Sequence, residues 1–333
     1  MIDWFPRPNL SHLLELIDDT GIFEHALYAV PRRSHGYTVD DAARALVVLL
    51  TPVATPEIVR ARSTLLALLL DAIGEDGTMH NRLGFDRRWH DSPHPGDHLG
   101  RAAWALGRLA AGPEQGLAEA ARAGFEQLAP PEGDHLRPYA LHALGAAAIL
   151  AARPDHITAV RAAELAVDRL GCGNRPWPER RLTYANGRIP QALLTLGDAI
   201  SHRGLLDRGL EILEWLAGVE RRGDHLSFTP VGGWEPGDPR PGFDQQPIEA
   251  AAYAEAALAA WHITGEFRWA EEVRRAGRWF LGANDSGAML IDPGSGAGYD
   301  GLEKDGINRN QGAESTISAL AVLQACAEVG TAG

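Results

Sequence analysis

Glu314 is the residue of this sequence best suited to acid–base chemistry. It lies in the stretch Asn310-Gln311-Gly312-Ala313-Glu314-Ser315-Thr316, and an apolar run over 317–325 follows directly. If Asn310 caps the helix that this pattern predicts, Glu314 lies beyond the capping-box position and faces inward among small residues. A buried carboxyl group must be paired or hydrogen-bonded, or have its pKa raised. A raised pKa suits a general acid, and a hydrogen-bonded, ionised carboxylate suits a base.

Four more carboxyl groups lie near the starts of predicted helices. They are Asp41, Asp97, Asp244 and Glu249. Thr38 and Asp41 have the spacing of a capping box, and Asp97 and Asp244 could be simple N-caps. Glu249 is harder to explain as a cap. All five acids, Glu314 included, are candidate catalytic residues.

The elements that would carry these residues are six pairs of helices. Charged amphipathic segments at about 10–19, 56–73, 114–128, 155–170, 205–219 and 266–281 each precede an Ala-, Gly- and Leu-rich segment that is polar only at its start. These second segments begin near residues 38, 97, 137, 187, 245 and 310. Repeated helix pairs stack, and six that close on themselves form an all-α (α/α)6 toroid with the apolar segments as the inner ring. We expect one such domain over 1–333; the alternative, an open solenoid, would need hydrophilic capping repeats that neither end shows.

In a toroid of this kind the six inner helices run parallel, so their polar starts meet at one mouth. A spacing of three or four residues places several polar side chains on shared faces there. They are Asp40 or Asp41 with Arg44, Asp97 with Arg101 and Trp104, Tyr139 with His142, Asn186 near Gln191, Gln246 with Glu249 and Tyr253, and Asn310 or Gln311 with Glu314 and Ser318. The sequence therefore predicts a polar basin on an apolar plug, the default ligand site of such a fold.

The composition favours a neutral ligand. The 333 residues are 45% hydrophobic and 23% charged, with a net charge of −13 and a sequence pI near 5.4. An acidic surface does not attract nucleic acid or an anionic membrane, whereas it admits a sugar. Some of the nine Trp residues could stack on sugar rings, although most belong to packing.

Cysteine content and hydropathy predict a cytoplasmic location. Only Cys172 and Cys326 are present, no run of 18 apolar residues occurs, and the start lacks a basic and then apolar region. We therefore expect no disulfide framework, no membrane span and no signal peptide.

The segment from Trp89 to His98 is rich in possible metal ligands. His90, His94 and His98 are spaced four apart, but Pro93 and Pro95 break any helix that would align them. No HExxH or CxxC element is present, and no Gly-rich phosphate loop follows a strand. We expect neither a metal nor a cofactor, and we expect this loop to contact a sugar at the rim.

Four motifs resemble those of a bacterial family of helical-toroid domains. They are His35-Gly36-Tyr37-Thr38-Val39-Asp40-Asp41-Ala42-Ala43-Arg44-Ala45-Leu46, Gly100-Arg101-Ala102-Ala103-Trp104-Ala105-Leu106-Gly107, Phe243-Asp244-Gln245-Gln246-Pro247-Ile248-Glu249-Ala250 and the opening stretch at Asn310. Many members are fused to, or encoded beside, a GT-B glycosyltransferase, and the family is often described only by that name. The resemblance implies a possible glycosyltransferase partner; this chain has no nucleotide-sugar-binding Rossmann pair, and Ala42 stands where the family's pattern has Asn.

The wider resemblance is to six-hairpin glycosidases. It implies an inverting hydrolase of a mannose- or glucose-containing oligosaccharide, with two carboxyl groups about 6.5–9.5 Å apart across a water. Asp97 or Asp41 would be the acid and Glu314 the base, with Asp244 and Glu249 as rivals. The side chains expected to hold the sugar are Asp40, Arg44, Trp89, Arg101, Tyr139, Tyr184, Asn186, Gln246, Asn310 and Gln311.

Three other functions stay open on the same fold. A sugar epimerase or isomerase usually needs two histidines at the basin floor, and only His142 has suitable spacing. A non-catalytic glycan-binding domain would assist a glycosyltransferase encoded nearby. A lyase would need cations for uronates, which the basin supplies only through Arg44, Arg101 and Arg188.

Overall fold

The computed structural model describes the chain except residues 1–4, 52–53, 172, 174 and 331–333, so Cys172 lies outside the described residues. Within the described part, twelve α-helices account for most of the fold. The odd-numbered helices are α1 (Ser11–Glu15), α3 (Pro56–Asp71), α5 (Gln115–Gln127), α7 (Ile157–Leu170), α9 (Arg203–Glu220) and α11 (Phe267–Phe280). The even-numbered helices are α2 (Val39–Leu49), α4 (Asp97–Ala110), α6 (Leu136–Ala152), α8 (Arg188–Ala199), α10 (Pro247–Thr264) and α12 (Ala313–Gly330).

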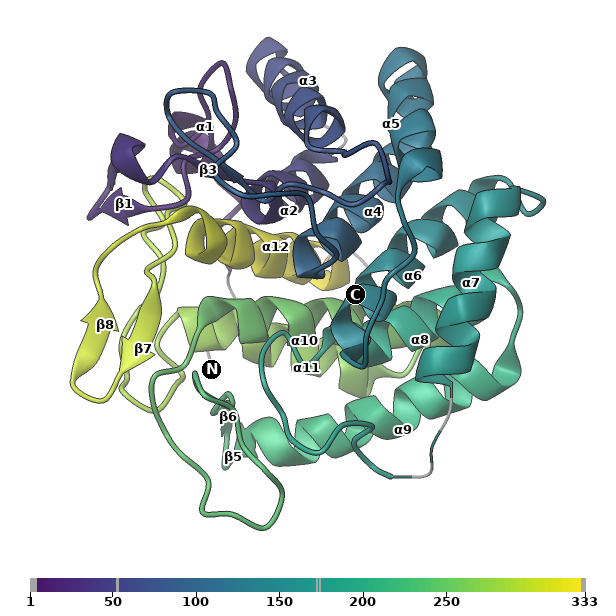
Figure 1. Ribbon diagram of the computed structural model, residues 1–333. Coiled ribbons are helices and arrows are strands. Elements are labelled where there is room, and N and C mark those ends of the chain that lie inside the picture. The colour runs from purple at the N-terminus through teal and green to yellow at the C-terminus, as the bar shows by residue number, and fades with distance from the viewer. Residues whose placement is uncertain (1–4, 52–53, 172, 174, 331–333) are drawn as a thin grey trace.

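The even-numbered helices form a closed inner ring. Each packs on the next, α2 on α4, then α6, α8, α10 and α12, and α12 returns to pack on α2. The odd-numbered helices lie outside this ring, as Figure 1 shows for α3, α5, α7 and α9. The predicted (α/α)6 toroid is therefore confirmed, and the open solenoid is wrong because the first and last inner helices are in contact.

Small residues let the inner helices approach closely. A side chain on Gly107 of α4 would meet the backbone of Gly145, and one on Gly145 of α6 would meet the carbonyl of Ala103. In α6 and α10, long runs of Ala and Leu are buried on all sides. Outer helices have one apolar face; α11, for example, buries Trp269 and Phe280 and leaves most of its charged side chains half-buried or exposed. This difference follows from the sequence, because only a helix with neighbours all round can be apolar all round.

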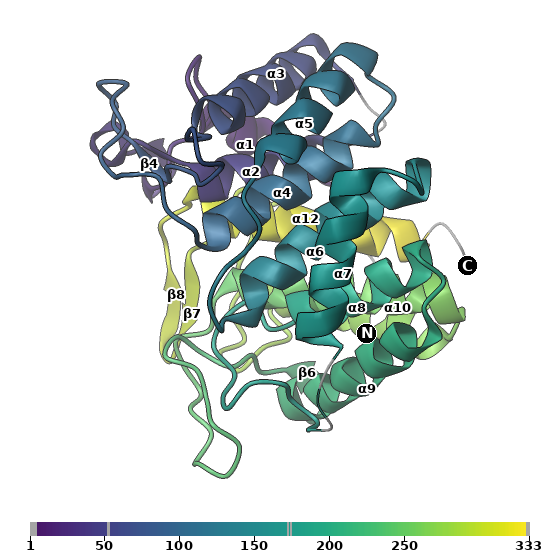
Figure 2. The same cartoon turned by 45° about the vertical axis from the view of Figure 1, so that its right-hand side comes forward.

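Short antiparallel strand pairs complete the loops. They are β1 (Ala26–Leu27) with β2 (Val30–Pro31), β3 (Tyr37–Thr38) with β4 (Arg82–Leu83), β5 (Arg221–Arg222) with β6 (His225–Leu226), and β7 (Gly301–Glu303) with β8 (Gly306–Asn308). The strands β4, β7 and β8 lie together at the left of Figure 2, and β1, β7 and β8 at the left of Figure 1. The β3–β4 pair and the β7–β8 hairpin contribute residues to the end of the ring at which α2 and α12 begin.

Two side chains that could have been N-caps do not cap their helices. α12 begins at Ala313, and Asn310 does not cap it, because its Oδ1 accepts a hydrogen bond from the backbone N–H of Tyr28 at 3.0 Å. α4 begins with Asp97 itself, and its N-cap is Gly96. The side chains of Asn310 and Asp97 bond to other segments instead, to the backbone of Tyr28 and to the hydroxyl of Tyr184. No helix in the described part of the chain is long and apolar enough to cross a membrane.

Candidate functional site

A polar cavity of about 330 Å³ opens where α2 and α12 begin, a size within the usual range for small-ligand sites. Its lining comprises Glu24, His25, Thr38, Asp40, Asp41, Arg44, Asn81, Arg82, Gln246, Asp300, Asn308, Gly312, Glu314 and Ser315. Five of these were expected from the sequence, namely Asp40, Asp41, Arg44, Gln246 and Glu314. The cavity therefore contains part of the predicted basin, namely the part supplied by the starts of α2, α10 and α12, and none of its described lining residues comes from α4, α6 or α8.

Arg44 joins two carboxylates across this cavity. Its Nη1 donates to Glu314 Oε2 at 2.6 Å, and its Nη2 donates to Asp41 Oδ1 at 2.9 Å. Arg44 and Asp41 are buried on α2, whereas the Glu314 side chain on α12 is 41% exposed. One guanidinium thus fixes a buried acid and an accessible acid relative to each other, through bonds of the charge-assisted kind.

The start of α2 positions Asp41. Thr38 is the N-cap of this helix, and its Oγ1 accepts from the backbone N–H of Asp41 and donates to Asp41 Oδ2 at 2.7 Å. The N-cap therefore explains the position of Asp41, and the burial of Asp41 explains the shift of its pKa. Loss of solvation raises the pKa of Asp41 to about 6, even though Arg44 and Thr38 favour the ionised form.

Asp40 has the opposite tendency. Burial would raise the pKa of Asp40, but the guanidinium groups of Arg101 and Arg44 outweigh it and hold that pKa below its ordinary value. Arg101 Nη1 donates to Asp40 Oδ1 at 2.6 Å. Two adjacent carboxyl groups with pKa values moved in opposite directions can hold and lack a proton at the same pH, which is the arrangement used for acid–base chemistry.

Asp97 lies next to this group but does not line the cavity. It accepts a hydrogen bond from the hydroxyl of Tyr184, and its Oδ2 is 3.9 Å from Arg101 Nη2. Burial raises the pKa of Asp97 despite that cation. Tyr184 packs against Arg137, whose guanidinium lies 4.9 Å from the ring centre.

Several expected side chains have other contacts. Asn310 and Gln311 hold the tip of the β1–β2 hairpin, since Gln311 N–H donates to Tyr28 O at 3.0 Å and Asn310 accepts from Tyr28 N–H. Tyr139 donates to Gly133 O and lies under Arg169 of α7, on the outer side of α6. Trp89 stacks on His80 in the loop before α4. Asp244 is exposed in the loop before α10.

Glu249 is bonded to the loop before α8 and not to the cavity. Its carboxyl oxygens accept from the backbone N–H groups of Ala185 and Asn186 and from the side-chain amide of Asn186. Burial, and next the nearby carboxylate of Glu220, raise the pKa of Glu249 to about 8. These contacts give Glu249 the geometry of a group that holds a loop in place.

A Glu249→Gln variant is expected to lose stability rather than turnover. Its NH2 group would face donors that now have an acceptor, so we expect the melting temperature to fall by about 2–4 °C. Between pH 4.5, the ordinary pKa of Glu249, and about pH 8, the folded state holds a proton at Glu249 that the unfolded state releases. The contribution of Glu249 to the free energy of unfolding is therefore lost as the pH rises through this window. Thermal unfolding from pH 5 to 8 should show a shallower decline for the variant than for the native protein. Glu119→Gln, on the exposed face of α5, is the control, and an unchanged slope in Glu249→Gln would contradict this role.

His142 does not face the cavity. Its ring packs edge-on against Phe125 of α5 at 5.3 Å, neither ring nitrogen has a hydrogen-bond partner, and burial lowers its pKa to about 4. The expectation drawn from its spacing is therefore wrong, because the phase of α6 turns this face outward. The one histidine among the described cavity residues is His25, which is 48% exposed.

The cavity also contains residues that were not among the expected site residues, most of them from segments between the helices. They are Glu24, His25, Thr38, Asn81, Arg82, Asp300, Asn308, Gly312 and Ser315. Glu24 pairs with Arg82, and Asp300 accepts hydrogen bonds from Gly312 N–H and the hydroxyl of Ser315. Thr38, Gly312 and Ser315 stood in the quoted motifs. The others lie in loops and short strands, whose position depends on the finished fold.

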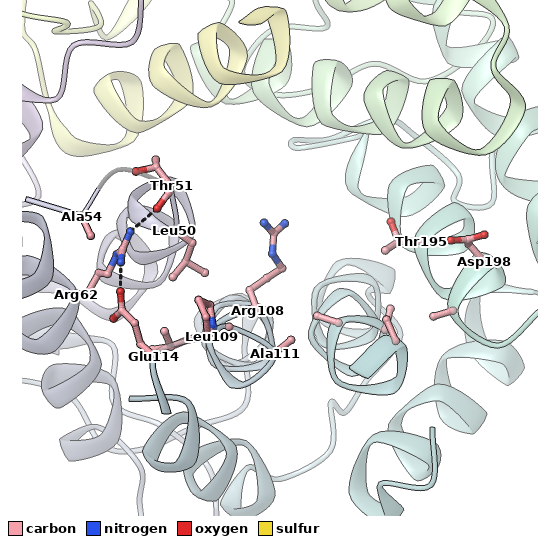
Figure 3. Close-up of a pocket in the computed structure, with 16 residues that line it drawn as sticks. Leu50, Thr51, Ala54, Arg62, Arg108, Leu109, Ala111, Glu114, Thr195 and Asp198 are labelled. Carbon is pink, nitrogen blue, oxygen red and sulfur yellow. Dashed lines mark hydrogen bonds and ion pairs between the residues drawn. The ribbon is translucent and has the colours of Figure 1, made fainter. Parts of the chain in front are cut away.

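A second cavity, of about 600 Å³, lies at the opposite end of the ring, where α2, α4, α6 and α8 end. Figure 3 shows Arg62 bonded to Glu114 and Thr51 there, and the Arg108 side chain extending between the helices. Arg62 also donates to Leu49 O, so it satisfies carbonyls at the end of α2. The rest of this lining is mainly Ala and Leu. Despite its larger volume, it lacks the converging carboxyl groups of the first cavity, which we take as the site.

The described residues contain no group of three or more His, Cys, Asp or Glu arranged to hold a metal ion. The described side chains that line the site supply carboxyl, guanidinium, amide, hydroxyl and imidazole groups.

No family model matches the sequence, and no curated protein does. Solved structures match over nearly the whole chain. A sugar epimerase from a ruminal bacterium matches with a TM-score of 0.71 and 11% identity, covering 93% of this chain and 94% of that one. The cellobiose 2-epimerase of Bacillus thermoamylovorans matches with a TM-score of 0.70 and 11% identity, covering 95% and 96%. An α-1,6-mannanase of a Salegentibacter species, solved with α-1,6-mannotriose, matches with a TM-score of 0.61 and 13% identity, covering 96% and 98%. At these identities the likeness shows a shared six-hairpin toroid.

Proposed function

We propose that this protein is a carbohydrate-active enzyme that hydrolyses a glycosidic bond in a neutral, mannose- or glucose-containing oligosaccharide. The observation that carries the proposal is the pair of carboxyl groups, Asp41 and Glu314, on helices from opposite ends of the chain and on either side of Arg44 in one polar cavity. Hydrolysis with inversion requires one carboxylic acid and one carboxylate, and no cofactor.

In the proposed mechanism Asp41 is the general acid and Glu314 the general base. Protonated Asp41 gives its proton to the glycosidic oxygen as the bond from that oxygen to the anomeric carbon breaks. Glu314, the more accessible of the two, takes a proton from the water that attacks the anomeric carbon from the other face. Arg44 holds both groups and stabilises the carboxylate that Asp41 becomes. Asp40, kept ionised by Arg101, accepts hydrogen bonds from sugar hydroxyls beside them.

Two features of the matching proteins bear on this choice. The Salegentibacter mannanase was solved as a variant made inactive by changing two consecutive aspartates to asparagine, and this chain carries consecutive aspartates, Asp40 and Asp41, in its cavity. The epimerases support sugar isomerisation as the second candidate. We favour hydrolysis because His142 faces outward and the exposed His25 is the one described histidine in the cavity.

A product assay separates the candidates. We expect the protein to release reducing ends from at least one member of a panel of mannose- and glucose-containing oligosaccharides, including α-1,6-mannotriose. The same panel is run in D2O, with NMR detection of deuterium at C2 of the reducing sugar. Deuterium incorporation without bond cleavage would establish the epimerase and refute the hydrolase. Calorimetric binding without either reaction would instead favour a glycan-binding domain that assists a glycosyltransferase.

A further inference from the structure

Four buried arginines surround a small void on the axis of the toroid. Its described lining is Arg44, Arg101, Trp104, Arg137, Leu141, Ala185, Arg188 and Ile248. The arginines come from α2, α4, α6 and α8 in turn, and each is at most 8% exposed. The void measures about 10 Å³, which is enough for one water-sized particle.

The carboxylates that pair with these arginines are not among the residues that line the void. Arg44 bonds to Asp41 and Glu314, and Arg101 bonds to Asp40. Arg137 Nη2 is 2.8 Å from Glu179, and Arg188 Nη2 is 2.6 Å from Glu255. None of these five acids lines the void.

The guanidinium groups are held in place by more than their ion pairs. Arg188 lies 4.5 Å from the ring centre of Trp104, and Arg137 lies 4.9 Å from that of Tyr184. A guanidinium has five N–H donors, and Arg101 makes one side-chain hydrogen bond, to Asp40. Arg101 therefore has N–H donors beside this enclosed space that the bonds to protein side chains do not use.

The lining distinguishes an anion from a water molecule. None of its eight side chains can accept a hydrogen bond, since they are Arg, Trp, Leu, Ala and Ile. A water molecule there would accept from the guanidinium groups but find no side-chain acceptor for its own hydrogens. A monatomic anion only accepts hydrogen bonds, so it matches a lining whose polar side chains are all donors.

We propose that this void is a binding site for a small monovalent anion of the halide class, held by Arg44, Arg101, Arg137 and Arg188. The site is separate from the polar cavity and borders it at Arg44, which lines both. The bound anion fixes Arg44 and Arg101, and through them the positions of Asp41 and Asp40. The proposal does not depend on which reaction the cavity performs.

Thermal unfolding tests the site without a substrate. The protein is melted in rising sodium chloride and, at matched ionic strength, in sodium gluconate, whose anion is too large for the void. We expect a saturable rise in melting temperature in chloride alone, of about 4 °C at 100 times the Kd. If the native protein melts at the same temperature in the two salts, the proposal is overturned.

Two variants and one crystal locate the effect. Arg188→Gln should lose most of the difference between the salts, whereas Arg203→Gln, on the exposed surface of α9, should keep it. Crystals grown in sodium bromide should show an anomalous peak between the four guanidinium groups. A chloride effect with no bromide peak there would place the anion elsewhere and refute this site, even if Arg188→Gln fails to fold.

Discussion

Glu314→Gln is expected to reduce kcat by about 10²–10⁴-fold on whichever oligosaccharide the native protein hydrolyses, because the amide cannot take a proton from the attacking water. The fold should be little affected. The Glu314 side chain is 41% exposed, and Arg44 keeps its bond to Asp41 when Glu314 is replaced. Partly exposed ion pairs contribute little to stability, so the melting temperature should stay within about 2 °C of the native value.

Initial rates of reducing-end release, together with thermal unfolding, measure both effects. Glu119→Gln, an exposed carboxyl group on α5, is the matched control and should leave rate and stability unchanged. A Glu314→Gln protein with native kcat would remove Glu314 from the mechanism. A protein that is inactive and strongly destabilised would point instead to a structural role for its pair with Arg44.

Asp41→Asn should change the response to pH as well as the rate. A general acid works in its protonated form, and the pKa of Asp41 is raised to about 6. The native kcat/KM should therefore fall as the pH rises through about 6. The variant should lose about 10²–10⁴-fold on natural oligosaccharides and should lack this decline, because asparagine does not titrate.

An activated substrate identifies the lost function as proton donation. A 4-nitrophenyl glycoside has a leaving group that needs little protonation, so Asp41→Asn should retain much more of the native rate on it than on the oligosaccharide. Asp198→Asn, which changes an exposed acid of the cavity at the opposite end, should behave like the native protein on both substrates. Equal losses on the two substrates would show that Asp41 has a role other than acid catalysis.

The architecture could be predicted from the sequence because each inner helix is polar only at its start and apolar all round afterwards. That pattern is local, and six copies of it leave few alternatives. It also located the part of the cavity that the helix starts supply, such as Asp41, Arg44 and Glu314. The rotation of each helix about its own axis depends on the helices packed around it and not on its own sequence pattern. This is why the sequence pattern did not reveal that Tyr139 and His142 face the outer layer.

The other half of the cavity depends on tertiary contacts. Asp300 and Asn308 come from the segment around the β7–β8 hairpin, and Glu24 and Arg82 meet only because two loops far apart in the sequence adjoin. Asn310 looked like a helix cap, but its partner is the backbone of Tyr28, 282 positions away. No spacing rule within one segment can reveal such a partner.

The ion pair between Arg44 and Glu314 also has a kinetic consequence. The two residues are 270 positions apart, and they meet only where the last inner helix returns to the first. Closing so long a loop costs entropy before the contact can form, so we expect this pair to form late in folding. If the proposed roles of Asp41 and Glu314 hold, we expect activity to appear only after the ring has closed, since only then do these two carboxyl groups meet at Arg44.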